Sequence, residues 1–179
     1  DPTRSNSGLQ TLLLMTYDYY KKTKGLQVSE LLDPKYQEWV KQIESGVSRF
    51  ETSTGTFMTD MIRFGPSKYD IAMVYENLAI SQIGNAQGRW GNLLVYYPPV
   101  TLWSDHPIAL LHGDWVSAAQ KDAARRLIAH LRSRPVQERA MLQGFRPADT
   151  SVAIRTVEGA NPWTRLAAFG IKVEVPPVA

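Results

Sequence analysis

The chain has 179 residues, which is enough for one large domain or for two small lobes with cores of their own. Hydrophobic residues make up 44% and charged residues 21%, a globular composition that excludes a disordered chain. Lys and Arg exceed Asp and Glu by 20 to 17, a surplus too small to indicate nucleic-acid binding, and the sequence has no cysteine for a disulfide or a thiolate metal site.

The amino-terminal stretch predicts a helix start that is rich in hydroxyl groups. Apolar residues repeat at helical spacing from Leu9 onward, and the residues before them are small and polar: Ser5, Asn6, Ser7 and Gly8. One of the first three can serve as the N-cap. The free N–H groups and the positive dipole end of such a start can also hold an anionic or carbonyl group. Ordinary capping is the usual use of these residues and accounts for them without a ligand.

A second stretch of the same chemistry follows about fifty residues later. It comprises Ser53, Thr54, Gly55 and Thr56, and it precedes an apolar helical face that Gly65-Pro66 closes. Between the two stretches, Asp33-Pro34 predicts the N-cap and the first helical position of a further helix.

Residues 69–75 and 93–97 predict strands. Both segments are apolar at successive positions, which is typical of strands buried on both faces of a helix-covered sheet. A helix is expected between them, beginning at Glu76, and a short strand is expected at 108–111. Helices that alternate with buried strands predict an α/β fold.

Two more helices are expected in the second half of the chain. Ser117 and Gln120 are spaced as a capping box for the first, and Pro135 begins the second, which ends at Gly144. We expect four residues to form the buried side of the first helix: Ala124, Leu127, Ile128 and Leu131. We expect its basic residues to be solvated: Lys121, Arg125, Arg126 and Arg132.

Catalytic and metal chemistry lack support in the sequence. Ser104, Asp105 and His106 are adjacent, whereas a catalytic triad recruits separated residues. The spacing of His106, His112 and Asp114 matches no established metal site. No phosphate-binding or dinucleotide-binding glycine pattern occurs. We therefore expect no catalysis, no metal and no cofactor.

Several segments carry a family resemblance. Residues 2–8 before a helix, the strand and glutamate of 69–76, and Tyr97-Pro98-Pro99 resemble the second lobe of a type 2 periplasmic binding protein. Residues 103–107, 115–120 and 144–148 are similar to bacterial extracellular solute-binding proteins, particularly those whose binding domain is followed by a von Willebrand factor A domain.

The resemblance implies a three-layer helix–sheet–helix lobe. Residues 1–97 would form the second lobe, 98–160 a return segment towards the first lobe, and 161–179 a carboxyl-terminal tail or linker. Proteins of this family begin with an export signal and most of a first lobe, and neither is visible here. The resemblance therefore implies that the chain is a fragment, with apolar surface on 108–111 and 117–132 that lacks its cover and promotes self-association.

The resemblance also implies a non-catalytic function. A small polar or anionic solute would bind between two lobes, in transport of the ABC type or in sensing, outside the cytoplasm in a periplasmic or membrane-anchored parent protein. A membrane permease or a downstream von Willebrand factor A domain would be the partner, and no nucleic acid is expected. The charge of Glu76 favours a cationic or polyhydroxyl ligand instead, so the ligand's charge stays open. The candidate contacts are Ser5, Asn6, Ser7, Gly8, Ser53, Thr54, Gly55, Thr56, Tyr75 and Glu76. If both hydroxyl-rich stretches face one cleft, the start of the first helix and the start of the 56–64 helix should converge on a common space.

A second function fits the same residues. Ligand-sensing effector domains of LysR-type transcription regulators resemble the same two-lobed fold and need the same hydroxyl-rich helix starts. An upstream helix-turn-helix would favour the regulator, and an upstream export signal would favour the binding protein. A structural or partner-binding domain that has lost its solute is a third possibility.

Overall fold

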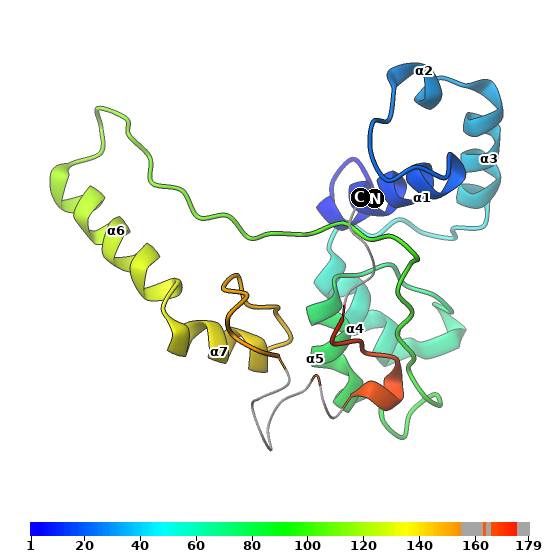
Figure 1. The fold of residues 1–179 in the computed structure, drawn as a ribbon. Coiled ribbons are helices and arrows are strands. Elements are labelled where there is room, and N and C mark those ends of the chain that lie inside the picture. The colour runs from blue at the N-terminus through cyan, green and yellow to red at the C-terminus, as the bar shows by residue number, and fades with distance from the viewer. Residues whose placement is uncertain (155–162, 164–165, 175–179) are drawn as a thin grey trace. The chain divides into compact units, whose positions relative to one another are not determined.

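The structure is a computed structural model that describes residues 1–154, 163 and 166–174 (Figure 1). Helices dominate these residues, and every long helix predicted from the sequence is present. The helices are α1 (Asn6–Tyr19), α2 (Val28–Leu31), α3 (Pro34–Ser45), α4 (Thr54–Phe64), α5 (Glu76–Ala86), α6 (Ala118–Leu131) and α7 (Arg134–Leu142), with short 3-10 helices η1 (Gly65–Ser67) and η2 (Ala167–Phe169).

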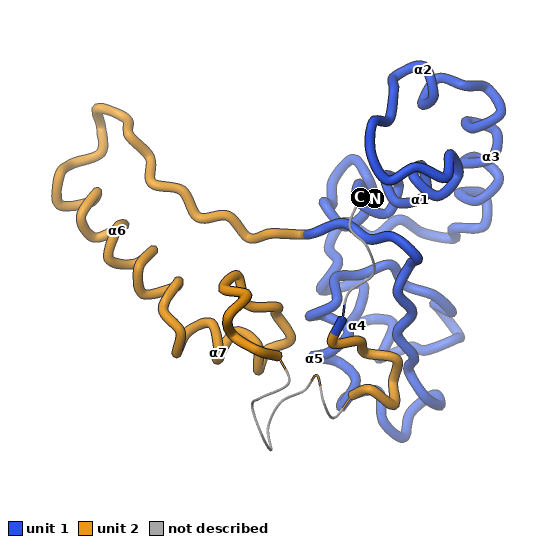
Figure 2. The backbone as a smooth tube through the Cα atoms, viewed as in Figure 1, with its two compact units in different colours: residues 1–103, 174–179 blue, residues 104–173 orange. Residues whose placement is uncertain are grey.

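The chain divides into two compact units. Unit 1 holds Asp1–Trp103 together with Glu174, and unit 2 holds Ser104–Val173 (Figure 2). The predicted domain boundaries after residues 97 and 160 stay predictions, because the presence of two compact units does not show whether they are the lobes that the resemblance implies.

Aromatic rings hold α1 against α3 in unit 1. The ring of Tyr19 lies 4.9 Å from that of Trp39 and 5.3 Å from that of Tyr36, centroid to centroid. The hydroxyl oxygens of Thr16 and Tyr36 are 2.5 Å apart in a buried hydrogen bond. The Thr16 hydroxyl donates to the carbonyl oxygen of Leu12 at 2.7 Å, so it accepts from the Tyr36 hydroxyl, and neither buried donor is unpaired.

The predicted start of α3 is confirmed. The Asp33 carboxylate accepts a hydrogen bond of 2.8 Å from the backbone N–H of Lys35, and Pro34 occupies the first helical position, where its missing N–H costs no bond.

The helices α4 and α5 form the other core of unit 1. Met58, Ile62 and Ala86 are buried there, and we call them the α4–α5 core. Gly65 ends α4 with φ at 58°, and a side chain at this position would meet the Trp90 ring at 2.4 Å. Only glycine fits both the backbone conformation and the neighbouring ring. Partly buried residues around this core are Met61, Val74, Leu78 and Leu93.

The predicted sheet is not supported in the part of the chain that the structure describes. Residues 69–75, 93–97 and 108–111 contain no strand, and Thr101 is the one bridge residue among the described residues. The α/β expectation is therefore corrected to a helix-rich fold with extended connections. Successive apolar residues indicate burial, but a strand also needs a neighbouring backbone to pair with, and no such pairing is present here.

The two extended segments of unit 1 are covered on one face instead of two. Val74 and Leu93 pack on the α4–α5 core, whereas Ile71 is 75% and Tyr96 84% exposed. Alternate residues thus point to the helices and to solvent. The prediction that both faces are buried is wrong for these segments.

The core of unit 2 forms around Trp163 and Met141, which are fully buried. The indole Nε1 of Trp163 donates to the carbonyl oxygen of Met141 at 3.2 Å, and the guanidinium of Arg146 lies 4.5 Å from the Trp163 ring centroid. Arg146 also donates to the carbonyl oxygens of Lys172 and Val173. Trp163 and the buried Ile171 fall within the predicted tail 161–179. Residues 161, 162, 164, 165 and 175–179 of that tail lie outside the described residues.

The helix α6 has the predicted capping box but not the predicted burial. The backbone N–H of Ser117 donates to Oε1 of Gln120 at 2.8 Å, and the N–H of Gln120 donates to Oγ of Ser117 at 3.2 Å. No residue of α6 is buried, and Leu127 is 51% exposed. Ala124 and Ile128 are half-buried and Leu131 is exposed, so the expected buried side is wrong.

Candidate ligand-binding site

The two hydroxyl-rich stretches meet in unit 1, at the starts of α1 and α4. The hydroxyl oxygens of Ser7 and Thr54 are 2.5 Å apart, those of Ser5 and Ser7 are 2.9 Å apart, and those of Ser5 and Thr54 are 3.1 Å apart. We call Ser5, Ser7 and Thr54 the hydroxyl cluster. The expectation that both helix starts converge on a common place is therefore confirmed.

Only one of the two helix starts is capped by a side chain. At α4, Oγ of Ser53 accepts from the N–H of Thr56 at 3.3 Å, which is an ordinary cap. At α1, Ser5 has the extended backbone of an N-cap, but no side chain caps the helix. The Ser5 hydroxyl bonds within the hydroxyl cluster instead. The usual role of an N-cap serine therefore does not explain Ser5.

The glycines beside the hydroxyl cluster have different surroundings. A Cβ atom on Gly8 would lie 2.7–2.8 Å from backbone atoms of Asp1 and Pro2, so this glycine allows the chain to fold back over the start of α1. A Cβ atom on Gly55 would meet nothing within 4 Å. Open space therefore lies beside Gly55, the neighbour of Thr54 in the first turn of α4.

A second contact joins the two stretches. The α-amino group of Asp1 donates to the carbonyl oxygen of Glu51 at 3.0 Å. The carbonyl oxygen of Asp1 accepts from the backbone N–H groups of Arg4 and Ser5 at 3.2 and 2.8 Å. The residues before α1 are thus tied to the residues before α4, and this tie fixes the two helix starts close together.

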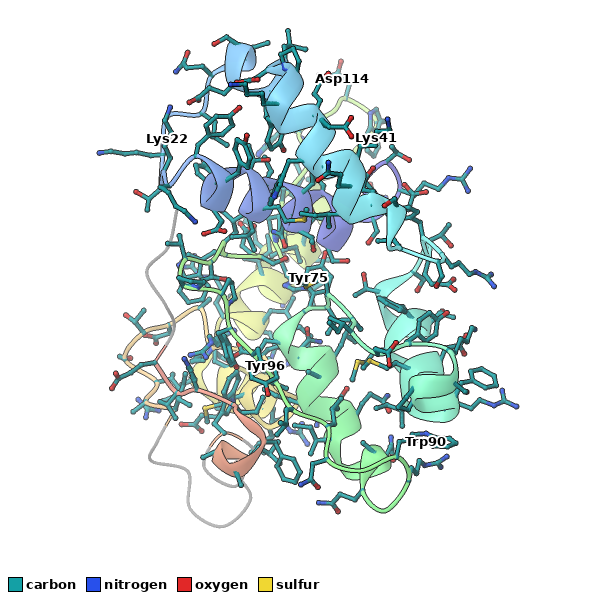
Figure 3. All side chains as sticks on the ribbon, turned by 90° about the vertical axis from the view of Figure 1, so that its right-hand side faces the viewer. Lys22, Lys41, Tyr75, Trp90, Tyr96 and Asp114 are labelled. Atoms are coloured by element: carbon teal, nitrogen blue, oxygen red, sulfur yellow. The ribbon has the colours of Figure 1, made fainter. Side chains whose placement is uncertain are left out.

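The other predicted contacts lie around this arrangement or at a third helix start. Asn6 and Thr56 are exposed in the first turns of α1 and α4. Tyr75 is the N-cap residue of α5, and its carbonyl oxygen accepts from the N–H groups of Leu78 and Ala79 (Figure 3). No hydrogen bond in the described part of the chain joins Tyr75 to the hydroxyl cluster.

Glu76 has a protein partner. Its carboxylate accepts a hydrogen bond from the hydroxyl of Tyr97, which links the start of α5 to the end of the extended segment 93–97. This bond gives Glu76 a structural role, and it weakens the argument that its charge selects a cationic ligand.

A pocket of about 240 Å³ in unit 1 was not predicted from the sequence. Its walls come from the end of α4, η1 and the residues after α5, and Trp90 and Tyr96 are labelled in Figure 3. None of the ten predicted contact residues lines it. Gly65 and Gly91, which turn the chain here, were visible in the sequence, but the contact of Gly65 with Trp90 was not. The lining residues are Met61, Ile62, Gly65, Pro66, Tyr69, Asp70, Ala86, Trp90, Gly91, Asn92, Leu93, Leu94 and Tyr96.

The hydroxyl cluster can exchange its own hydrogen bonds for bonds to a ligand. Each hydroxyl can donate one proton and accept two hydrogen bonds, and it rotates to suit its partners. In residues 1–154, 163 and 166–174, no group of three or more His, Asp or Glu side chains could hold a metal ion. His106 packs edge-on against Phe145, with 5.3 Å between the ring centroids.

A scan against protein-family models finds no matching family, and searches of curated proteins and of solved structures find no significant match. The geometry of the helix starts is therefore the main support for a function.

Proposed function

We propose that the chain is a non-catalytic solute-binding module that holds a small anionic or polar ligand at the hydroxyl cluster. The observation that carries the proposal is the convergence of Ser5, Ser7 and Thr54 from two helix starts that are 47–49 residues apart in sequence. A ligand oxygen at this place would accept from the hydroxyls and from backbone N–H groups of the first turn of α1, which no side chain caps.

The surroundings of the hydroxyl cluster favour an anionic group over a cationic one. Two helix starts direct the positive ends of their dipoles towards this place. The carboxylates that precede the two helix starts are already engaged: Asp1 accepts from the N–H and the hydroxyl of Thr3, and Glu51 accepts from the Tyr69 hydroxyl and pairs with Arg49. Small carboxylates and oxyanions are the ligand class that this chemistry fits best.

The proposal includes a larger architecture. In a two-lobed solute-binding protein, residues 69–75 and 93–97 would pair as strands of a three-layer lobe, and the exposed faces of Ile71 and Tyr96 would be covered. The parent protein would work outside the cytoplasm, with a permease or a von Willebrand factor A domain as partner. The family resemblance of the sequence supports these points.

Calorimetric titration of the full chain tests the proposal. The probes are inorganic phosphate, sulfate and succinate, with glycerol as a neutral control. We expect one or more anions to bind and glycerol to bind less. Ser7→Ala and Thr54→Ala should each weaken anion binding by about 1–3 kcal/mol, the cost of losing one buried hydrogen bond.

Gly55→Ala is the sharpest variant, because its new methyl group enters open space beside Thr54. Alanine also has the higher helix propensity, so the variant should fold at least as stably as the parent chain while binding the anion more weakly. Ser117→Ala, at the N-cap of α6, is the matched control that removes a hydroxyl far along the chain. Anion affinity that is unchanged in Ser7→Ala, Thr54→Ala and Gly55→Ala would reduce the hydroxyl cluster to a packing feature.

A further inference from the structure

The small positive surplus of the chain is concentrated in one region. Residues 1–103 contain ten Lys and Arg and ten Asp and Glu, so they carry no net charge. Residues 104–173 contain ten basic and six acidic residues. Within them, residues 118–142, which form α6 and α7, hold six basic and two acidic residues. The whole excess of unit 2 therefore lies on two consecutive helices.

Three of these basic residues form a stripe along α6 and its end. Lys121, Arg125 and Arg132 are spaced by four and seven residues, which places them within about 40° of one another around a helix with 3.6 residues per turn. We call them the basic stripe. Lys121 and Arg125, four residues apart, are like charges that destabilise a helix, so an anion along the stripe would stabilise it.

The basic stripe has no acidic partner in the described part of the chain. The nearby ion pairs use other residues: Arg126 pairs with Asp122 at 2.9 Å, and Arg134 pairs with Glu138 at 2.9 Å. Both acidic residues of α6 and α7 are thus already engaged. The stripe is consequently a surface of uncompensated positive charge, and its complement must be anionic.

Exposed apolar side chains accompany the basic stripe. Leu127 and Leu131 lie one turn apart on a neighbouring face of α6, and both are exposed. Trp115, three residues before the helix begins, is 74% exposed. No residue of α6 is buried, and an isolated helix of 14 residues is marginally stable in water, so a surface that binds both faces would stabilise α6.

We propose that α6 docks on the surface of a bilayer that contains anionic lipids. The basic stripe would bind lipid phosphates, while Leu127, Leu131 and Trp115 would enter the boundary between headgroups and acyl chains. Binding would be peripheral, because no described helix is long and apolar enough to cross a membrane. A lipid surface fits better than nucleic acid, since the phosphate backbone of a nucleic acid would leave the leucines and the tryptophan in water.

Flotation of the full chain with vesicles tests this proposal. We expect the chain to bind phosphatidylcholine vesicles that contain about 30 mol% phosphatidylglycerol, which gives them a negative surface. We expect weak binding to vesicles of pure phosphatidylcholine, and loss of binding to the anionic vesicles as the salt concentration rises. Arg125→Gln/Arg132→Gln should lower the partition coefficient by about 25-fold, or about fivefold for each charge. Arg125→Lys/Arg132→Lys should retain most of the binding, because lysine keeps the charge.

A matched control distinguishes the effect of the basic stripe from the effect of the net charge of the chain. Lys24→Gln/Lys35→Gln removes the same charge from exposed positions of unit 1 and should leave the partition coefficient unchanged. Circular dichroism of each variant shows whether the helix content of the chain is retained. Equal binding to both vesicle types, or equal losses in the two glutamine pairs, would overturn the proposal. Tighter binding of a duplex DNA than of the anionic vesicles would overturn it in favour of nucleic acid.

Discussion

The helices α4 and α6 have similar local sequence features but different surroundings. Both begin after a serine whose hydroxyl accepts from the N–H three residues on, and both carry apolar residues at helical spacing. The helix α4 buries Met58 and Ile62 against α5, whereas α6 buries no residue. Local sequence therefore specifies a helix, and the presence of a partner element decides whether its apolar face contributes to stability.

The largest expected effect comes from truncating the buried face of α4. Met58 is 2% exposed, so Met58→Ala should lower the free energy of unfolding by about 2–5 kcal/mol through lost burial and a cavity. Leu127→Ala, the matched change in α6, should cost less than about 0.5 kcal/mol because Leu127 already contacts water.

Urea unfolding of both variants measures the difference. Equal losses would mean that α6 is covered in solution by something that the described residues do not include, and they would break the contrast between the two helices.

The end of α4 gives the next largest effect. Gly65→Ala places a methyl group against the Trp90 ring and strains a backbone with φ 58° and ψ −150°, so the free energy of unfolding should fall by more than the roughly 1–3 kcal/mol of backbone strain alone. Gly25→Ala is the control, since Gly25 also has positive φ but has open space around it. Thermal unfolding of both variants isolates the packing contribution, and a Gly65→Ala chain no less stable than the Gly25→Ala chain would contradict the Trp90 contact.

Removing the caps sharpens the comparison of the two helices. Ser53→Ala and Ser117→Ala each remove a hydrogen bond to a helix start, and each should cost about 1 kcal/mol. In α4 this loss should reduce global stability, because α4 is part of a core. In α6 it should appear as faster amide hydrogen exchange confined to the helix. Exchange that accelerates throughout unit 2 in Ser117→Ala would show that α6 unfolds together with the rest of that unit.

The smallest effect depends on pH and concerns unit 1. A hydrogen bond from Lys22 and another from the backbone of Gln27 hold the pKa of Glu30 below its ordinary value. Because the pKa of Glu30 is lower in the folded chain than in the unfolded chain, its ionised carboxylate stabilises the folded state at pH values above the ordinary pKa. This contribution is lost as the pH falls through the pKa of the folded chain. Lys22→Gln should raise the pKa of Glu30 in an NMR titration. An unchanged titration would show that the Lys22 contact does not persist in solution.

The parts of the fold that were predictable depend on neighbouring residues. The Asp33 cap and the Ser117–Gln120 capping box were visible because their partners lie two or three residues away. The sheet was not predictable in the same way. Residues 69–75 and 93–97 have the composition of buried strands, but pairing requires a neighbouring backbone, which composition does not supply.

The candidate site was predictable in part. The sequence showed two hydroxyl-rich helix starts and led to the expectation that they meet, and the bonds between Thr54 and the serines confirm the meeting. It could not show that Ser5 bonds across to Thr54 instead of capping α1, because both roles use the same hydroxyl. The ligand itself stays a prediction.

The sequence by itself determined where helices begin and end, since caps, glycine stops and proline starts act within one turn of the chain. The tertiary structure alone decided which faces are covered: it partly buries one side of 93–97 and places Trp90 against Gly65. It also leaves α6 without a buried residue. These outcomes depend on contacts between residues far apart in sequence, and hydrophobic burial, being non-directional, does not specify from one segment which partner will cover it.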